Sequence, residues 1–135
     1  MKAVKTLSAA SLVIFCSAIA LAQDPVKVDP KHYKLVTEND KVRVLRITYG
    51  PKEKSVMHDH PGSVAVLLTD QNVRFHTPDG KSEVVTAKAK EAIWSLAGKH
   101  LPENLSEKPL EGILVELKGK PAAAPAPPKA PPKKQ

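Results

Sequence analysis

The sequence predicts an all-β domain, a small antiparallel sandwich or barrel, between two end segments that do not belong to it. Short runs rich in β-branched residues follow one another along residues 33–118. Turn signals separate these runs about every 8–12 residues, a spacing typical of antiparallel β-proteins. Residues 86–91 are the one stretch with a helical composition, and they are too few to form a stable helix.

The first 22 residues have the features of a secretory signal peptide. Lys2 and Lys5 form a short positive region, an apolar run covers residues 9–22, and the Ala-Leu-Ala at its end matches the small-x-small cleavage pattern. The run is too short for a good membrane span, and no second apolar run follows it. We therefore expect a chain that a bacterium exports to the periplasm or secretes, cut after Ala22 and left with no transmembrane span. An uncleaved N-terminal anchor is the alternative.

The only cysteine, Cys16, lies inside this apolar run. After cleavage the chain would carry no thiol, although it travels to an oxidising compartment. Its stability would then come from a hydrophobic core rather than from disulfides.

At the other end, residues 119–135 consist mainly of Pro, Ala and Lys. A segment without large apolar side chains cannot offset the chain entropy that it would lose on folding, so we expect a disordered, extended tail. A solvated spacer is the simpler role for this tail. Contact with an anionic envelope surface is the alternative.

The net charge of +7 comes from the two ends of the chain. Lys2, Lys5 and four lysines of the tail lie outside residues 23–118, whereas all 14 acidic residues lie inside them. The domain that remains, residues 23–118 with a core at 33–118, is therefore close to neutral. It also lacks interleaved aromatic and basic residues, so the sequence predicts no nucleic-acid partner.

In the first half of the domain, an irregular lead-in precedes the first strands. Residues 24–31 are polar and bounded by prolines, so we expect them to be extended. Residues 42–49 are rich in β-branched side chains and alternate, with Arg43, Leu45 and Ile47 on one face. A Gly-Pro pair ends this strand. Two further segments that we expect to be β are residues 33–36 and 56–60.

The second half of the domain carries the most apolar strands. Residues 63–69 form a continuous apolar run, which is typical of a strand buried on both faces. Thr-Pro-Asp-Gly at residues 77–80 is a strong turn signal, and it joins residues 73–76 and 82–87 into a hairpin. The remaining expected elements are a strand at 92–96, a turn at 97–99, a loop at 104–109 and a closing strand at 112–117.

Two of the five histidines, His58 and His60, stand one residue apart in a predicted strand. Successive side chains of a strand point to opposite faces, so the two imidazoles share one face and Asp59 takes the other. His100 follows the predicted turn at 97–99. Histidines that are distant in sequence and brought together by strands are what a metal site in a barrel requires.

The other notable side chains have simpler roles in this interpretation. We expect His32 at the surface or in a capping position, and His76 near solvent beside the hairpin turn. Trp94, the only tryptophan, is expected in the core. Asn104 is expected to stabilise a turn or a strand pairing.

The pattern formed by Gly50, His58 and His60, and then by Gly98, His100 and Asn104, matches two motifs of a known family. With this pattern, the chain resembles a small single-domain bacterial cupin, a double-stranded β-helix or jelly-roll barrel. The resemblance covers roughly residues 33–118 and implies that His58, His60 and His100 are metal ligands.

One ligand of the family is missing from this chain. The glutamate of the first cupin motif would fall near Val64 or Ala65, and neither can bind a metal. Asp59 is expected to face away from the barrel, and Glu103 lies in the segment after His100, where nothing supports an inward orientation. The resemblance therefore implies a ligand set of three imidazoles without a carboxylate.

Such a ligand set suits a divalent transition metal such as Zn, Fe, Ni or Cu, whereas Mg and Ca prefer oxygen ligands. One side of the ion would stay open to a small-molecule ligand. Hydrolytic chemistry with zinc and oxygen chemistry with iron are both available. Neither is favoured, because the sequence shows no second charged group that faces the site as a general base.

Three functions follow from these observations. The first is an exported cupin that binds a divalent transition metal through its three histidines and senses or binds a small ligand there. The second, by analogy with the fold, is a small metal-dependent cupin enzyme, an oxygenase or isomerase. The third is a metal-free envelope interaction module tethered by the tail. A homodimer is a further expectation, because dimers are common in this fold.

Overall fold

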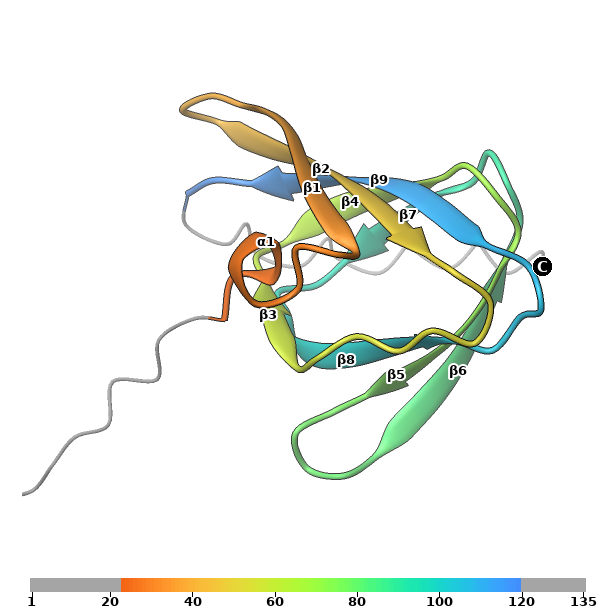
Figure 1. Cartoon of the computed structure of the whole chain (residues 1–135). Helices are drawn as coiled ribbons and strands as arrows, with labels where there is room; N and C mark the ends of the chain where they lie inside the picture. Colours follow the sequence, from red (N-terminus) through yellow and green to blue (C-terminus); the bar gives the residue numbers. More distant parts are fainter. Residues whose placement is uncertain (1–22, 120–135) are drawn as a thin grey trace, which may run out of the picture.

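The structure, a computed structural model, describes residues 23–119. The predicted signal peptide and nearly all of the predicted tail lie outside these residues. Within them, strands form two antiparallel sheets that face each other (Figure 1). The first sheet has the order β1 (Tyr33–Glu38), β2 (Val42–Tyr49), β9 (Leu110–Leu117), β4 (Ser63–Leu67) and β7 (Ala92–Ser95). The second has the order β3 (His58–His60), β8 (Gly98–Asn104), β5 (Gln71–His76) and β6 (Ser82–Ala87).

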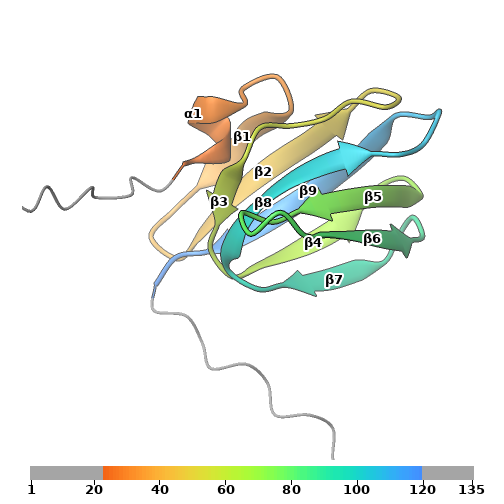
Figure 2. The same cartoon turned by 90° about the horizontal axis from the view of Figure 1, so that it is seen from below.

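The strand order brings distant parts of the chain together. The last strand, β9, pairs with β2 on one side and with β4 on the other. Strand β8 pairs with β3 over its first residues and with β5 over its last residues. Figure 2 shows the two layers from below, with β3, β8, β5 and β6 over the larger sheet. The predicted antiparallel β-domain is confirmed.

The core lies between the two sheets and is formed by side chains from both. Its largest cluster of buried apolar residues consists of Tyr33, Leu45, Tyr49, Val73, Leu110 and Leu114. Burial of such side chains is the main stabilising contribution in a domain of this size. A domain of fewer than about 100 residues has room for only one hydrophobic core, and this cluster forms it.

The expectation of an extended lead-in at residues 24–31 is wrong. A short helix, α1 (Pro25–Val28), stands there, and the Asp24 side chain accepts a hydrogen bond from the Val26 amide. Proline suits the first position of a helix because its missing N–H would have no partner there. Among the described residues, no helix is long and apolar enough to cross a membrane.

The expected turn at residues 97–99 is also wrong, because Gly98 and Lys99 already belong to β8. Pro102 lies within this strand, although proline cannot donate a ladder hydrogen bond. The Pro102 carbonyl accepts from the Ser55 amide, so the missing N–H faces the loop that contains Ser55. The pairing with β5 on the other side of the strand is therefore left intact.

The outer face of the larger sheet is unusually apolar. One row of directly paired residues crosses four strands, from Val44 through Val115 and Val64 to Trp94. Trp94 lies at the end of this row with 43% of its surface exposed, so its predicted place in the core is wrong. Because both faces of these strands carry apolar residues, the sequence does not show which face is buried.

Candidate metal centre

His58, His60 and His100 come together on the inner face of the smaller sheet. His58 and His100 are directly paired across β3 and β8, and His60 lies two residues further on the same face of β3. The ring centroids are 4.8 Å apart for His58 and His60, 5.1 Å for His58 and His100, and 5.3 Å for His60 and His100. The convergence predicted from the His-x-His spacing and His100 is confirmed.

One ring nitrogen from each histidine lies within 4.8 Å of the others, so the group could hold a metal ion. His58 is fully buried, and His60 is only 6% exposed. The three rings belong to two neighbouring strands, so the backbone ladder sets their spacing. A site carried by strands is more rigid than one carried by loops.

Hydrogen bonds set which nitrogen of His58 is available. His58 Nδ1 lies 2.7 Å from the Val56 carbonyl oxygen, so Nδ1 carries the proton and donates it. The other nitrogen, Nε2, is buried and has no hydrogen-bond partner among the described residues. A buried acceptor without a partner costs free energy, and a metal ion at Nε2 would remove that cost.

His60 is oriented by a buried carboxylate. Glu116, which is 3% exposed, accepts a hydrogen bond from His60 Nδ1 at 2.6 Å. This bond leaves Nε2 of His60 free, as in the carboxylate–histidine pairs that support metal sites. Glu116 was not predicted from the sequence, because it supports a ligand and does not bind the metal itself.

Glu116 is in turn held by Arg43, its direct partner in the pairing of β2 and β9. Arg43 Nε lies 3.0 Å from a Glu116 oxygen as an ion pair without hydrogen-bond geometry. The guanidinium also donates to both oxygens of Asp24, with a shortest distance of 2.6 Å. The hydrogen bond from Arg43 is the main reason that the pKa of Asp24 is lowered. A chain of ion pairs thus links the beginning of α1 to His60.

A second polar chain reaches His58. Ser55 donates a hydrogen bond to Asp29, and Ser55 Oγ lies 3.3 Å from His58 Nδ1. Asp29 also contacts His32 Nδ1 at 2.7 Å, and the other nitrogen of that ring contacts Glu53 at 3.1 Å. His32 is only 5% exposed, so its predicted surface position is wrong. It fixes the segment after α1 against the loop that precedes β3.

The electrostatic surroundings keep two of the three rings neutral. Burial, followed by the nearby His60, lowers the pKa of His58 to about 4. Burial, followed by His60 and His58, lowers the pKa of His100 to about 3. A neutral imidazole has the lone pair that a metal needs, so these rings do not have to lose a proton at neutral pH before they bind.

The donor set therefore fits a borderline divalent ion. Three imidazoles suit Zn, Fe, Ni or Cu, and two of the rings have their second nitrogen bonded to an oxygen acceptor. No carboxylate joins the three rings as a fourth ligand among residues 23–119. Glu103 lies elsewhere, where it pairs with His76 at 2.9 Å and with Arg74 at 3.4 Å.

Comparison with solved structures identifies the architecture. A cupin domain from Bordetella pertussis superposes with a TM-score of 0.60 and 21% identity, over 64% of this chain and 92% of that one. The fold is that of the cupins. A comparison with protein-family models finds no match, and a comparison with curated protein sequences finds none either.

Two further structures agree with this assignment of the cupin fold. A double-stranded β-helix protein from Klebsiella pneumoniae has a TM-score of 0.53 and 18% identity, over 68% of this chain and 82% of that one. An RmlC-like cupin-family protein from Methanocaldococcus jannaschii has a TM-score of 0.51 and 13% identity, over 63% and 77%. At these identities the likeness concerns the fold alone.

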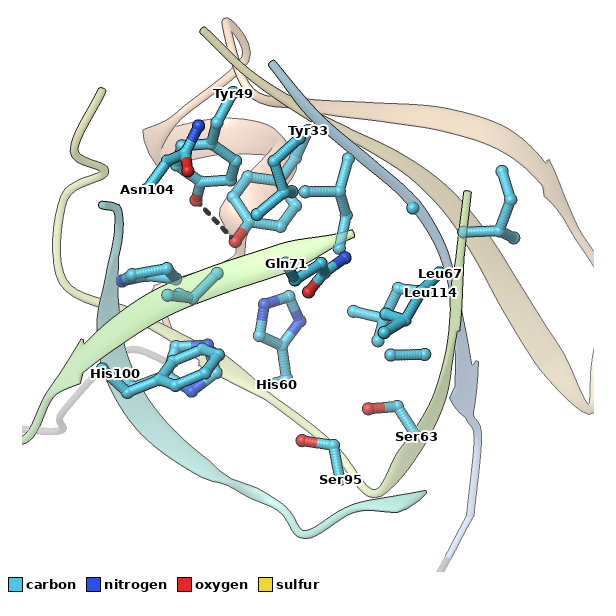
Figure 3. A pocket seen from close by; sticks show the side chains of 18 residues that line it. Tyr33, Tyr49, His60, Ser63, Leu67, Gln71, Ser95, His100, Asn104 and Leu114 are labelled. Atoms are coloured by element: carbon cyan, nitrogen blue, oxygen red, sulfur yellow. Dashed lines mark hydrogen bonds between the residues drawn. The ribbon is translucent and has the colours of Figure 1, made fainter. Parts of the chain in front are cut away.

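Inside the cupin barrel, a cavity of about 90 Å³ opens next to His60 and His100 (Figure 3). Apolar side chains from both sheets form much of its wall, among them Leu67, Phe75 and Leu114. The polar side chains that line it, besides the two histidines, are Tyr33, Tyr49, Ser63, Gln71, Ser95 and Asn104. The barrel therefore offers a mixed pocket beside the histidine cluster.

Two tyrosines close one side of this pocket. The hydroxyl groups of Tyr33 and Tyr49 lie 2.9 Å apart and share a hydrogen bond. Burial raises the pKa of both tyrosines, so both stay protonated at neutral pH. The Tyr33 ring also packs against His58 at 4.8 Å and His60 at 5.4 Å between centroids. The pair can donate hydrogen bonds but cannot serve as a base.

Asn104, the last residue of the second cupin motif, has the structural role predicted for it. Its side chain is 1% exposed and donates to the carbonyl oxygens of Gly50 and Lys108, both at 2.9 Å. Its carbonyl oxygen accepts from the Ser106 amide at 3.0 Å. Asn104 thereby stabilises the loop that follows β8.

Proposed function

We propose that the chain is an exported cupin that binds a divalent transition metal through His58, His60 and His100 and holds a small ligand beside it. The observation that carries the metal part is the unpartnered, fully buried Nε2 of His58 within a cluster of three imidazoles. In the metal-free alternative, this nitrogen would stay buried without a protein partner. Export rests on the sequence features of residues 1–22.

Each histidine has a defined task in this proposal. His58 and His60 present Nε2, because Val56 and Glu116 hold their Nδ1 protons. His100 completes the set from the neighbouring strand. A divalent ion held there would act as a Lewis acid toward an oxygen or nitrogen donor of the ligand. The cavity beside His60 and His100 supplies the space for that ligand.

Binding or sensing is favoured over acid–base catalysis by the composition of the cavity wall. Within the described part of the chain, no Asp, Glu or Lys lines this cavity. The Tyr33 and Tyr49 hydroxyls stay protonated, so neither can accept a proton from a ligand. A positioned general base is what proton-transfer chemistry would need.

The test is the metal content of the protein purified without a histidine tag. Elemental analysis, followed by chelator competition with Zn, Fe, Ni and Cu, should show one ion per chain and rank the four metals. His58→Ala and His100→Ala should each lose the ion, since removal of one of three ligands leaves a weak site.

The matched control is His76→Ala, because His76 lies outside the cluster and pairs with Glu103. This variant should keep the ion at the level of the unaltered protein. Equal metal content in all three variants, or no metal in the unaltered protein after reconstitution, would contradict the proposal. Circular dichroism of each variant separates loss of the site from loss of the fold.

A further inference from the structure

The cavity beside the histidine cluster carries information about the ligand that it accepts. It lies between the two sheets, with His60 and His100 in its wall. In Figure 3 the His60 ring lies between the tyrosine pair and the hydroxyl groups of Ser63 and Ser95. The cavity thus has one polar region around these groups and an apolar region formed by residues such as Leu67, Phe75 and Leu114.

The first property of the cavity is its lack of charge. None of the described side chains that line it belongs to Asp, Glu, Lys or Arg. Glu116, the carboxylate that contacts the lining residue His60, is already paired with His60 and Arg43. A charged group that entered the cavity would lose its hydration and find no ionic partner among these side chains. Apart from a metal ion held by the histidines, the lining therefore selects against charged molecules.

The second property is an unsatisfied hydroxyl group. Ser63 is fully buried, and its Oγ has no hydrogen-bond partner among the described residues. Ser63 lies at the start of β4 and is directly paired with Ser95 on β7, so both hydroxyls are on the inner face. Both point into the cavity (Figure 3). A buried hydroxyl without a partner costs free energy, which a bound molecule with a polar group would offset.

The third property is size. The cavity has a volume of about 90 Å³. An apolar cavity of about 150 Å³ in another protein holds benzene, so this one suits a smaller molecule of about three to five non-hydrogen atoms. The apolar walls would cover the carbon atoms of such a molecule.

We propose that this cavity binds a small, uncharged molecule with one hydroxyl or carbonyl group, which hydrogen-bonds to Ser63 while the carbon atoms pack against Leu67, Phe75 and Leu114. This proposal specifies the small ligand of the proposed function. It rests on that function only because the same pocket adjoins the metal site. The hydrogen bond and the apolar contacts come from the barrel wall, so binding through Ser63 does not require the ion.

Isobutanol is a suitable probe, with isobutyrate and isobutylammonium as charged molecules of similar shape. Binding is measured by ligand-observed NMR and by shifts of the protein amide signals. The comparison uses chelator-treated protein, because a carboxylate could otherwise bind to the ion. We expect isobutanol to bind at least tenfold more tightly than either charged probe. Equal or tighter binding of a charged probe would overturn the proposal.

Ser63→Ala tests the role of the hydroxyl group. It removes the unpartnered oxygen without adding volume, so it should fold and bind isobutanol about three- to tenfold more weakly. Ser82→Ala, on the exposed strand β6, is the matched control and should bind like the unaltered protein. Unchanged affinity in Ser63→Ala would show that the hydroxyl does not bind the ligand, and no binding of isobutanol to any form would show that only water occupies the cavity. Either result would overturn the proposal.

Repeating the titration with metal-loaded protein separates this proposal from the metal site. If the protein fails to bind metal but still binds isobutanol in a Ser63-dependent manner, the ligand class stands and the metal site is wrong. If metal binds through the histidines but Ser63→Ala binds isobutanol normally, the metal site stands and the ligand class is wrong.

Discussion

Glu116 is the side chain on which the orientation of His60 depends. It accepts the His60 Nδ1 proton at 2.6 Å and is held from behind by Arg43. A buried carboxylate in this position fixes the tautomer of the ring and increases the electron density on Nε2. Its contribution is therefore to metal affinity, although it does not touch the metal position.

We expect Glu116→Gln to weaken metal binding by about 10–100-fold. The amide keeps a similar shape but loses the negative charge that supports His60. Competition with a chromogenic chelator near neutral pH measures the change. Glu111→Gln is the matched control, because Glu111 lies on the opposite face of β9 with 39% of its side chain exposed. Unchanged affinity in Glu116→Gln with an intact fold would refute this role.

The histidine cluster should also make the metal-free protein sensitive to acid. The pKa of His58 is lowered to about 4 and that of His100 to about 3, while both titrate near 6.5 in the unfolded chain. Between about pH 6.5 and 4 the unfolded chain therefore binds more protons than the folded one. The stability contribution is fully present above about pH 6.5 and is lost as the pH falls.

We expect the free energy of unfolding to fall by up to about 1.4 kcal/mol per pH unit for each of the two histidines in this window. Urea denaturation of chelator-treated protein between about pH 7 and 4.5 measures the slope. His100→Gln should show a smaller slope than the unaltered protein. A stability that does not change over this range would contradict the lowered pKa values.

At the scale of elements, β8 and the loop after it connect the metal site to the rest of the barrel. His100 lies in the part of β8 that pairs with β3, and Asn104 ends the part that pairs with β5. The buried Asn104 side chain joins this end to Gly50 after β2 and to Lys108 before β9. The Asn104 amide thus connects the end of β8 to the segment after β2 and to the segment before β9.

Asn104→Ala should destabilise the domain by about 2 kcal/mol, because two buried carbonyl groups lose a donor. Urea denaturation monitored by Trp94 fluorescence measures the loss. Asn72→Ala, in the neighbouring strand β5, should cost under about 0.5 kcal/mol, since no hydrogen bond holds that side chain in the described residues. Equal effects of the two substitutions would mean that Asn104 has no special structural role.

At the scale of the whole molecule, two facing sheets bury the histidine cluster and the cavity, while the outer face of the larger sheet stays apolar. The row from Val44 to Trp94 belongs to that outer face. The homodimer expected from the sequence remains a prediction, and sedimentation equilibrium of the purified domain would test it.

Export is a prediction about the whole chain. When the full sequence is produced in a bacterial host, mass spectrometry of the periplasmic fraction should find a chain that begins at Gln23. Cleavage after Ala22 requires a small residue at that position, so Ala22→Phe should leave the leader attached. A full-length, membrane-associated product from the unaltered sequence would favour the uncleaved anchor instead.

Much of the cupin fold could be predicted from the sequence, because strands and turns depend on neighbouring residues. The β-branched runs, the hairpin turn at residues 77–80 and the His-x-His spacing are local patterns of this kind. The predictions for residues 24–31 and 97–99 are wrong because the structure of these segments does not depend on local composition alone. Their structure depends on an N-cap at Asp24 and on pairing of β8 with β3, which composition does not show.

The buried face of β9 is the clearest case that the sequence predicts poorly. Ile113, Val115 and Leu117 form the more apolar face, yet the opposite face, which carries Leu114 and Glu116, is the buried one. Period-two alternation shows that two faces exist, but the partner sheet decides which one it covers. Glu116 therefore gave no recognisable signal as a partner of His60.

The sequence by itself determined the β-class of the domain and the three histidines that could bind a metal. The β-class follows from composition, and the shared face of His58 and His60 follows from side-chain alternation along one strand. His100 was added by its place in the cupin motif. Only the tertiary structure decided that Glu116 supports His60, that Ser63 lacks a partner and that an uncharged cavity adjoins the site. These features arise where strands distant in sequence pack face to face, and no local pattern encodes that packing.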